Sequence, residues 1–194
     1  VAVSSGGHIA PGASTGTLTI SGDLNLGPGS ILDYQLATPG VIGSGVPAMI
    51  AVGGNLTLDG TLNVTDAGHF GNGVYTLITY GGSLIDVGLD IGTVPGSFDT
   101  QIQAGGGNVN LVVGGQAGGP TQFWDGSNTA ANNIIDGGSG TWASSTTNWT
   151  DAAGDTNTDW GGQLAVFGGS AGTVTVVGPQ TFTGMQFLVD GYEI

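Results

Sequence analysis

Short runs that alternate polar residues with Leu, Ile or Val recur along this chain and constrain its fold more than any other feature. Two near-copies show the pattern: GTLTISGDLNL at residues 16–26 and GGNLTLDGTLNV at residues 53–64. Successive side chains of a β-strand point to opposite faces, so a period of two predicts strands with one buried face and one solvated face. Helical periodicity is almost absent. We therefore expect an all-β protein.

The same pattern continues to the end of the chain. The runs are short, rich in β-branched and aromatic residues, and bounded by Gly, Pro, Asp or Ser, as expected of strands. The 41 glycines among 194 residues supply the many turns that such short strands need. The runs are TLTI (17–20), DLNL (23–26), ILDYQL (31–36), NLTL (55–58), TLNV (61–64), VYTLITY (74–80), NVNLVV (108–113), TVTVV (173–177) and QFLVD (186–190).

Two architectures fit these strands: a sandwich or barrel of antiparallel strands, and a β-solenoid of stacked coils. The two-residue junctions Ser21-Gly22 and Asp59-Gly60 are compatible with both, as coil corners or as hairpin turns. The recurrence of a degenerate unit favours the solenoid. Asn25, Thr57 and Asn63 suit ladders of like residues between coils. We expect one continuous spiral with coils of about 20–25 residues, about 4.8 Å apart along the axis.

The composition changes near VVGGQAGGPTQFW, residues 112–124. No tryptophan precedes this stretch, and all four follow from its last residue on: Trp124, Trp142, Trp149 and Trp160. Its Gly-rich and Pro-containing core is typical of a seam between segments. We therefore predict two β-helical segments, residues 1–115 and residues 116–194.

The charge balance excludes several classes of partner. The chain has 14 acidic residues and neither Lys nor Arg, which gives a formal net charge of −14. Nucleic-acid binding depends on Lys and Arg that neutralise phosphates, and anionic membrane surfaces repel an acidic protein, so we expect neither contact. The chain has no cysteine, which excludes disulfides and thiolate sites. It also lacks an apolar run of the ~18 residues that a membrane-spanning helix needs.

Three segments resemble a known family. Residues 7–36 (GHIAPGASTGTLTISGDLNLGPGSILDYQL) are similar to the passenger repeats of bacterial type V secreted autotransporters. Residues 71–84 (GNGVYTLITYGGSL) resemble the stretch that usually follows. Residues 123–192, from FWDGS to LVDGY, resemble the autotransporter-associated β-strand repeat. The resemblance implies a right-handed parallel β-helix outside the outer membrane of a Gram-negative bacterium.

The resemblance also implies a function, although passengers of this family include adhesins, cytotoxins and enzymes. We expect a structural and adhesive segment of a passenger at the cell surface or in the medium, forming a rigid stalk or fibre without catalysis or cofactor. The expected partners are neighbouring coils of the same longer chain, identical subunits end to end, or a surface protein or glycan. The family's N-terminal signal and C-terminal barrel are absent from the sequence, and we expect it to be a fragment.

Residues 151–162, DAAGDTNTDWGG, are the sharpest candidate metal site. Oxygen ligands at alternate positions match the start of a calcium loop; the candidate ligands are Asp151, Asp155, Asn157 and Asp159. Trp160 stands where such a loop needs Gly, and Val166 where it needs a bidentate Glu. A solvated Asp/Asn loop at a coil corner is the alternative, and we expect no bound metal. His8 and His69 have no partner at metal-ligand spacing, so we expect structural or surface roles for them.

Two alternative functions remain open. One is a calcium-stabilised binding module, which would use the loop at residues 151–162. The other is a polysaccharide hydrolase or lyase on the same scaffold, which would need a pair of carboxylates. Glycosidases place two carboxyl groups about 5–9.5 Å apart. The candidates are Asp86 with Asp90, or Asp33 with a neighbour from the adjacent coil. Most acidic residues instead precede glycine at turns, where Asp bonds its own backbone. A lyase would also need a basic group, so we expect no catalytic residues.

The four tryptophans allow two interpretations. They could form an exposed platform for sugar rings or a partner protein, or they could stack in the core of successive coils. Their irregular spacing does not decide between these. We predict that most of them are core residues and that Trp160, which lies in the Asp-rich loop, is the one exposed.

Overall fold

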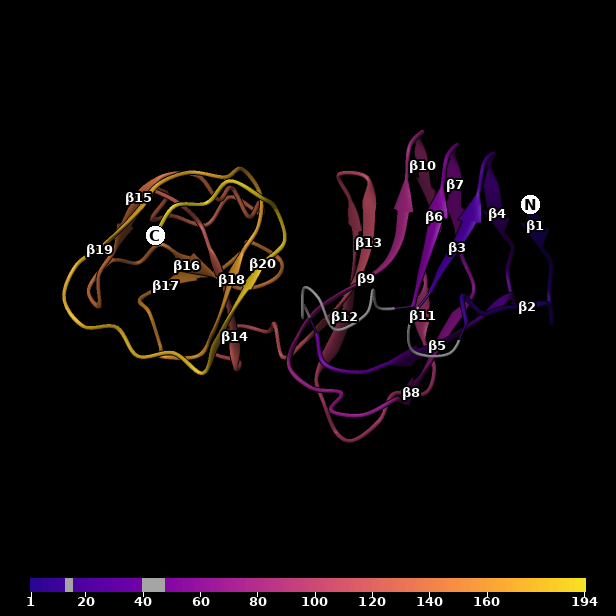
Figure 1. Ribbon diagram of the computed structural model, residues 1–194, viewed down its shortest axis with the longest axis horizontal. Coiled ribbons are helices and arrows are strands. Elements are labelled where there is room, and N and C mark those ends of the chain that lie inside the picture. The colour runs from indigo at the N-terminus through magenta and orange to yellow at the C-terminus, as the bar shows by residue number, and fades with distance from the viewer. Residues whose placement is uncertain (13–15, 40–47) are drawn as a thin grey trace. The chain divides into compact units, whose positions relative to one another are not determined.

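The computed structural model describes residues 1–12, 16–39 and 48–194, which divide into two compact units, Val1–Val112 and Val113–Ile194. We call them unit 1 and unit 2. The described residues form twenty β-strands and no helix, which confirms the all-β prediction (Figure 1).

The strands of unit 1 are two to eight residues long, and β4 to β8 alternate more and less buried side chains. Their bounds are β1 Ala2–Val3, β2 His8–Ile9, β3 Thr17–Ile20, β4 Leu24–Leu26, β5 Ile31–Leu36, β6 Met49–Val52, β7 Leu56–Leu58, β8 Thr61–Asp66, β9 Gly73–Tyr80, β10 Leu84–Asp86, β11 Asp90–Ile91, β12 Thr100–Gly105 and β13 Asn108–Val113.

These strands form three sheets. Sheet A has the order β1-β4-β7-β10, sheet B the order β11-β8-β5-β2, and sheet C the order β12-β13-β9-β6-β3. From β1 to β9 the chain enters sheets A, B and C in that order three times, and then enters A and B again with β10 and β11. The strands of sheets A and B pair in parallel, as do β3, β6 and β9 of sheet C. This arrangement is compatible with a β-solenoid.

The turns of this stack are unequal, and most are longer than expected. The step from His8 to its partner Ile31 lies within the expected coil length. The steps from Leu24 to Leu56 and from Leu56 to Leu84 exceed it. The expectation of about 20–25 residues per coil was therefore wrong for the later turns. One reason is strand length, because β5 and β8 have six residues and β9 has eight, whereas β2 of the first turn has two.

Both two-residue junctions are corners between sheets. Ser21-Gly22 joins β3 of sheet C to β4 of sheet A, whereas Asp59-Gly60 joins β7 of sheet A to β8 of sheet B. Neither is a hairpin turn. The two near-copies in the sequence therefore occupy different corners. The structural equivalents of Ser21-Gly22 are Gly53-Gly54 and Gly81-Gly82, which also lead from sheet C to sheet A.

Glycine is required at this corner because successive turns meet there at backbone distance. A Cβ atom on Gly53 would lie 2.6 Å from the carbonyl oxygen of Ser21, and one on Gly81 would lie 2.8 Å from that of Gly53. The amides of Gly53 and Gly81 donate to the carbonyls of Ile20 and Val52 in the preceding turn, at 2.7 and 3.0 Å. A side chain at either position would break this contact. Glycine is therefore required at this corner because the turns stack directly on one another.

The core of unit 1 consists of rows of aliphatic residues in register between turns. Leu56, Leu62 and Ile50, one in each sheet, have no exposed surface. Burial of each such side chain contributes about 1.5–3 kcal/mol. The rows are Leu24, Leu56 and Leu84 in sheet A; Ile9, Leu32, Leu62 and Ile91 in sheet B; and Leu18, Ile50 and Ile78 in sheet C.

The expected ladder of like polar residues does not form. Asn25 lies in register with Thr57, but Asn63 belongs to sheet B and pairs with Asp33. The physical reason is that Ser21-Gly22 leads from sheet C to sheet A, whereas Asp59-Gly60 leads from sheet A to sheet B. Equivalent positions of the two near-copies therefore lie in different sheets.

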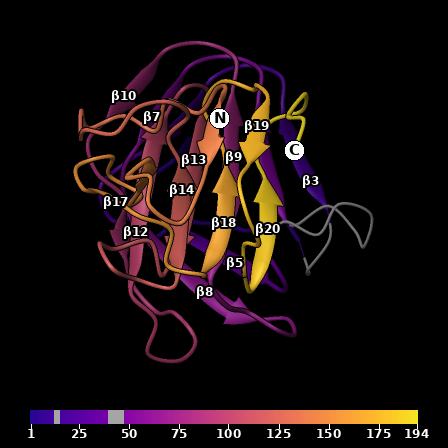
Figure 2. The same cartoon turned by 90° about the vertical axis from the view of Figure 1, so that its left-hand side faces the viewer.

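Unit 2 combines parallel and antiparallel pairing. Strand β14 pairs in parallel with β18, and β18 with β20, and these arrows lie side by side in Figure 2. On its other edge β14 pairs with β16, and β16 with β17, both antiparallel. The strands are β14 Thr121–Trp124, β15 Gly140–Trp142, β16 Trp149–Thr150, β17 Asn157–Thr158, β18 Leu164–Phe167, β19 Val174–Val176 and β20 Gly184–Phe187.

The antiparallel pairs were not expected. They lie on the edge of β14 opposite to β18. Within the described ranges, each sheet belongs to one unit, apart from Val113 at the end of β13. The single continuous spiral stays a prediction.

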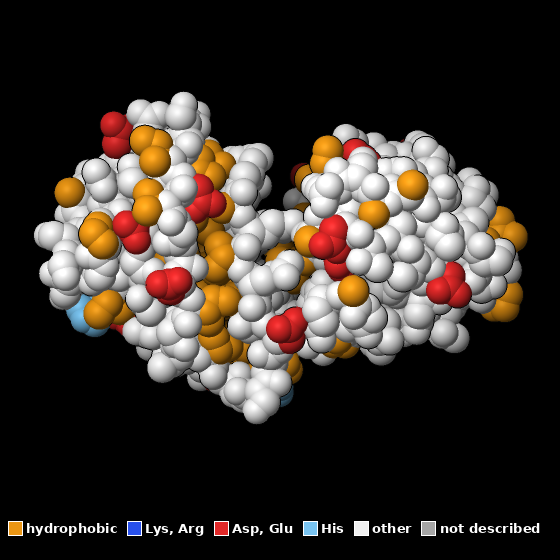
Figure 3. Space-filling view, turned by 180° about the vertical axis from the view of Figure 1, so that it is seen from behind, with side chains coloured by type: hydrophobic (Ala, Val, Ile, Leu, Met, Phe, Trp, Pro, Cys, Tyr) orange, Lys and Arg blue, Asp and Glu red, His pale blue; other side chains and the backbone are white. Residues whose placement is uncertain are grey.

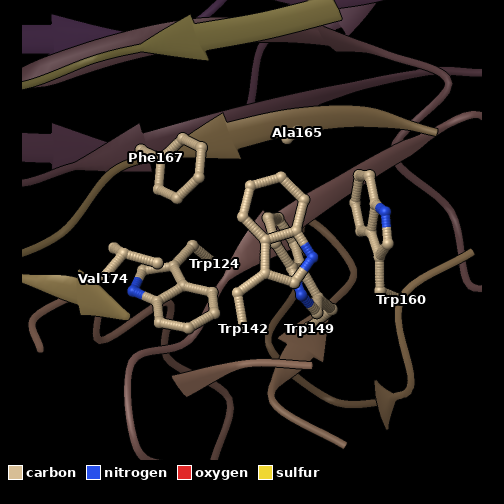
Figure 4. Close-up of a cluster of buried hydrophobic side chains, with 7 residues drawn as sticks. All are labelled: Trp124, Trp142, Trp149, Trp160, Ala165, Phe167 and Val174. Atoms are coloured by element: carbon tan, nitrogen blue, oxygen red, sulfur yellow. The ribbon is translucent and has the colours of Figure 1, made fainter. Parts of the chain in front are cut away.

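The core of unit 2 is a tryptophan cluster. It consists of Trp124, Trp142, Trp149, Trp160, Ala165, Phe167 and Val174 (Figure 4). Trp149 is fully buried, with ring centroids 5.3 Å from Trp124, 5.0 Å from Trp142 and 4.2 Å from Trp160. Such edge-on and tilted pairs add to the free energy of burial.

The prediction that most tryptophans are core residues is confirmed, but the exposed position predicted for Trp160 was wrong. Its side chain is 8% exposed, and its Nε1 donates to the carbonyl of Thr181 at 2.7 Å. The Asp-rich loop around it is polar, yet the indole turns inward because it packs against the rings of Trp142 and Trp149.

Replacing Trp149 with alanine is expected to lower the free energy of unfolding of unit 2 by about 3–5 kcal/mol, because it opens a cavity among aromatic rings. Urea denaturation followed by tryptophan fluorescence measures this directly, since all four tryptophans lie in unit 2. Val177→Ala, at an exposed site of the same unit, is the control and is expected to change it by less than about 0.5 kcal/mol. Equal effects of the two substitutions would contradict the role of the cluster.

Candidate functional site

The outer face of sheet B gathers polar side chains in register on adjacent strands. Alternation along β5 directs Leu32 and Tyr34 inward and Asp33 and Gln35 outward. On β8, Asn63 lies in register with Asp33, and Thr65 with Gln35. The result is two adjacent polar pairs on a hydrogen-bonded sheet.

A groove of about 440 Å³ runs over these pairs. Asp33, Gln35, Asn63 and Thr65 line it, together with Ala10, Gly12 and part of Tyr34. The Tyr34 ring is buried, and its hydroxyl donates to the carbonyl of Leu77 at 2.8 Å. A ligand in the groove would therefore meet a carboxylate, two amides and a hydroxyl, all of which exchange hydrogen bonds with water or ligand. We call it the sheet-B groove.

A chain of hydrogen bonds across four turns fixes the carboxylate of this groove. The Nδ1 of His8 lies 2.6 Å from one oxygen of Asp33, and the amide of Asn63 donates to the other at 3.3 Å. The backbone and hydroxyl of Thr93 both donate to Oδ1 of Asn63, each at 3.1 Å. Asn63 can link its neighbours because an amide both donates and accepts.

The pKa of Asp33 is lowered, first by its hydrogen bond with His8 and next by that with Asn63, although burial works in the opposite direction. Asp33 is thus ionised at neutral pH. The His8 and Asp33 side chains are 58% and 42% exposed, so the pair contributes little to stability. From the sequence, Asp33 is also a candidate for one half of a carboxylate pair with a neighbour from the adjacent coil. In adjacent turns its side chain contacts the imidazole of His8 and the amide of Asn63.

A second polar ladder follows the corner between sheets C and A. The backbone and side-chain amides of Asn55 donate to Oδ1 of Asp23 at 2.7 and 3.2 Å, and the backbone of Ser83 donates to Oδ1 of Asn55 at 2.8 Å. Sequence reasoning missed this ladder. The signal was present, because GDL, GNL and GSL recur at residues 22–24, 54–56 and 82–84.

The other two candidate acids, Asp86 and Asp90, belong to different sheets. Asp86 of β10 accepts from the amide of Gly88 at 3.1 Å, as expected of a turn Asp. Asp90 belongs to β11, and both side chains are exposed. The topology therefore places these two carboxylates in different sheets, Asp86 in sheet A and Asp90 in sheet B.

The acidic loop at residues 151–159 is only partly brought together. Asp151 is buried, and its Oδ1 accepts from the amides of Ala153 and Asp155, both at 3.2 Å. Asn157 turns away and donates to Oδ2 of Asp125 at 2.9 Å. Asp159 is exposed. In the part of the chain that the structure describes, no three His, Cys, Asp or Glu side chains are grouped to hold a metal ion.

Burial raises the pKa of Asp151, and the adjacent carboxyl of Asp155 adds to the shift. Asp125, by contrast, is fully buried with both oxygens satisfied: Oδ1 by the amide of Asp136 at 2.8 Å and Oδ2 by Asn157. The importance of Asp125 was not foreseen, because its Asp-Gly sequence is the same as that of an ordinary turn.

The Asp and Glu side chains of this protein have no Lys or Arg among them. Figure 3 shows red carboxylate side chains scattered over the visible face and none of the blue that would mark Lys or Arg, in keeping with the sequence. Within residues 1–12, 16–39 and 48–194, no helix has the length and apolar character needed to cross a membrane.

Comparison with known proteins places these features in context. Over 97% of its length the chain is 46% identical to part of the "Adhesin BmaC autotransporter" of Brucella suis biovar 1 (strain 1330). The chain is therefore related to a bacterial autotransporter. This confirms the resemblance to autotransporter passengers, while the assignment of residues 123–192 to the autotransporter-associated repeat stays a prediction. The chain spans 6% of the length of that relative.

Two further comparisons returned no match. No protein-family model matches the chain. No solved structure matches it either.

Replacing Asn63 with aspartate is expected to lower the free energy of unfolding at pH 7 by about 1–2 kcal/mol, because it removes the donor to Asp33 and sets two carboxylates side by side. The loss should shrink as the pH falls below about 4 and the carboxyls are protonated. Far-UV circular dichroism in urea at pH 3 and pH 7 gives the measurement. Asn108→Asp, away from the ladder, is the matched control; a pH-independent loss at Asn63 would contradict the ladder.

Asp151→Asn is expected to gain stability relative to the unchanged chain as the pH rises. The pKa of Asp151 is raised in the native state, so the protonated carboxyl is favoured by folding. Its contribution to the free energy of unfolding is complete below the pKa of the unfolded chain, about 3.9, and is lost as the pH rises through the native pKa. Asparagine keeps an Oδ1 for both amides without the buried charge. The measurement is the difference in unfolding free energy between pH 3.5 and pH 7.

Asp190→Asn, which removes an exposed charge from the same unit, corrects the Asp151 experiment for the change in net charge. If the Asp151→Asn difference is flat with pH or falls as the pH rises, the carboxylate is not destabilised by burial.

Proposed function

We propose that the chain is an adhesive and structural segment of an autotransporter passenger, exposed at the surface of a Gram-negative bacterium or released from it. The observation that carries the proposal is the 46% identity across 97% of the chain to a protein named as an autotransporter adhesin. Because the chain corresponds to 6% of that adhesin, adhesion by this particular segment is part of the proposal.

The proposed architecture is a right-handed parallel β-helix that acts as a stiff stalk. Two observations support it: the cyclic order of strands through sheets A, B and C, and the in-register aliphatic rows between turns. In such a stack each turn bonds only to its neighbours, so length is gained without a larger core.

A non-enzymatic role is supported by the contacts of the acidic side chains. Asp23 and Asp33 accept from asparagines of the next turn, Asp86 from its own turn, and Asp125 from the backbone of Asp136. These carboxylates have structural partners. The chain also lacks the basic residues with which a lyase would bind an anionic sugar.

Neighbouring coils of the same longer chain, or identical subunits packed end to end, are the partners we propose for the outer edge of unit 2. Strand β20 is the last strand of its sheet, and its Met185 and Phe187 are partly exposed. Phe187 stacks on Phe167 of β18, with ring centroids 5.0 Å apart and planes 13° from parallel. A further in-register strand would cover both side chains and extend the sheet. A surface protein or glycan is the proposed partner for adhesion.

The test of adhesion uses beads coated with the purified chain and added to cultured epithelial cells. We expect native beads to be retained in greater number than beads carrying the heat-denatured chain, which have the same composition and charge. Equal retention of both would contradict an adhesive role. Because the chain contains no Lys or Arg, trypsin has no site in it and can be used freely on the cells.

A further inference from the structure

We propose that the sheet-B groove binds a neutral saccharide. This deepens the proposed adhesive function and rests on it, since it assigns to the adhesive segment a ligand class and a place on the fold. The volume of about 440 Å³ lies within the ~300–1,000 Å³ typical of small-molecule sites.

Three of the four polar side chains of the groove, those of Asp33, Asn63 and Thr65, form hydrogen bonds within the protein before any ligand arrives. Asp33 is fixed between His8 and Asn63, and the hydroxyl of Thr65 donates to the carbonyl of Tyr34 at 3.3 Å. Both strands are locked in register by the sheet. Such preorganisation lowers the entropic cost of binding.

Hydrogen-bonding capacity remains for a ligand. Each oxygen of Asp33 accepts a protein hydrogen bond and has a further lone pair. The exposed Gln35 adds both a donor and an acceptor beside it. The carboxylate of Asp33 and the amide of Gln35 lie on the same face of the sheet and match neighbouring hydroxyls of a sugar ring. One hydroxyl would donate to the carboxylate, and the next could donate to the amide oxygen or accept from the amide nitrogen.

The chemistry of the groove selects against other ligands. Protein interfaces draw most of their energy from Trp, Tyr and Arg. Tyr34, the aromatic residue that lines the groove in the described chain, is buried, and the sequence has no Arg. Anionic sugars would meet an ionised Asp33 and a net charge of −14, with no Lys or Arg to bind them. A neutral, hydroxyl-rich ligand remains.

The direct test is titration of the isotope-labelled full chain with lactose, cellobiose, maltose and chitobiose, with sialyllactose and a heparin disaccharide as anionic members. The side-chain amide signals of Gln35 and Asn63 are followed by nuclear magnetic resonance. We expect at least one neutral sugar to shift these signals saturably and the anionic ones to leave them unchanged. Gln35→Ala should weaken that sugar's binding about fivefold, as for one lost hydrogen bond. Gln180→Ala in unit 2 is the matched control and should bind as the unchanged chain does.

The inference is overturned if no neutral sugar shifts the groove signals, if an anionic sugar binds more tightly, or if Gln35→Ala and Gln180→Ala bind alike. The bead assay separates this failure from failure of the adhesive role. Beads that adhere, lose adhesion when the cells are treated with trypsin, and are not displaced by sugars would leave adhesion standing with a protein receptor. Saccharide binding by a chain whose beads do not adhere would leave the groove standing alone.

Discussion

The parallel, in-register pairing of one turn with the next is the interaction on which the rest of unit 1 depends. It sets Leu24 above Leu56 and Leu84, so that each turn adds to a continuous apolar row. It also brings the corners so close that Gly53 and Gly81 leave no room for a side chain. Core and turn composition are thus two consequences of one spacing, about 4.8 Å between hydrogen-bonded strands.

The same spacing explains how a chain without Lys or Arg organises its acidic groups. Stacked turns place Asp23 beside Asn55 and Asp33 beside Asn63, and an asparagine can donate to the carboxylate below it while accepting from the turn above. Amides therefore take the place of cations. On the outer face of sheet B this arrangement leaves an ionised carboxylate in the lining of the sheet-B groove.

Much of the fold could be predicted from local pattern, because alternation and turn residues act over a few positions. The strands near residues 17–20, 31–36 and 61–64 were placed correctly for that reason. The partners of each strand were harder to predict. The likeness of the two near-copies suggested equivalent corners, yet Ser21-Gly22 corresponds to Gly53-Gly54, and turns of unequal length hide that correspondence. The groove was missed because it joins Gly12, Gln35 and Asn63 across turns.

The sequence by itself determined the all-β class, the acidic surface and the exclusion of disulfides, since these follow from composition and from side-chain alternation. It also placed all four tryptophans in one segment. Only the tertiary structure decided that Trp160 faces inward, that β16 runs antiparallel to β14 and β17 antiparallel to β16, and which asparagine meets which aspartate. The reason is that these outcomes depend on contacts between residues far apart in the sequence, and register over such distances is set by packing.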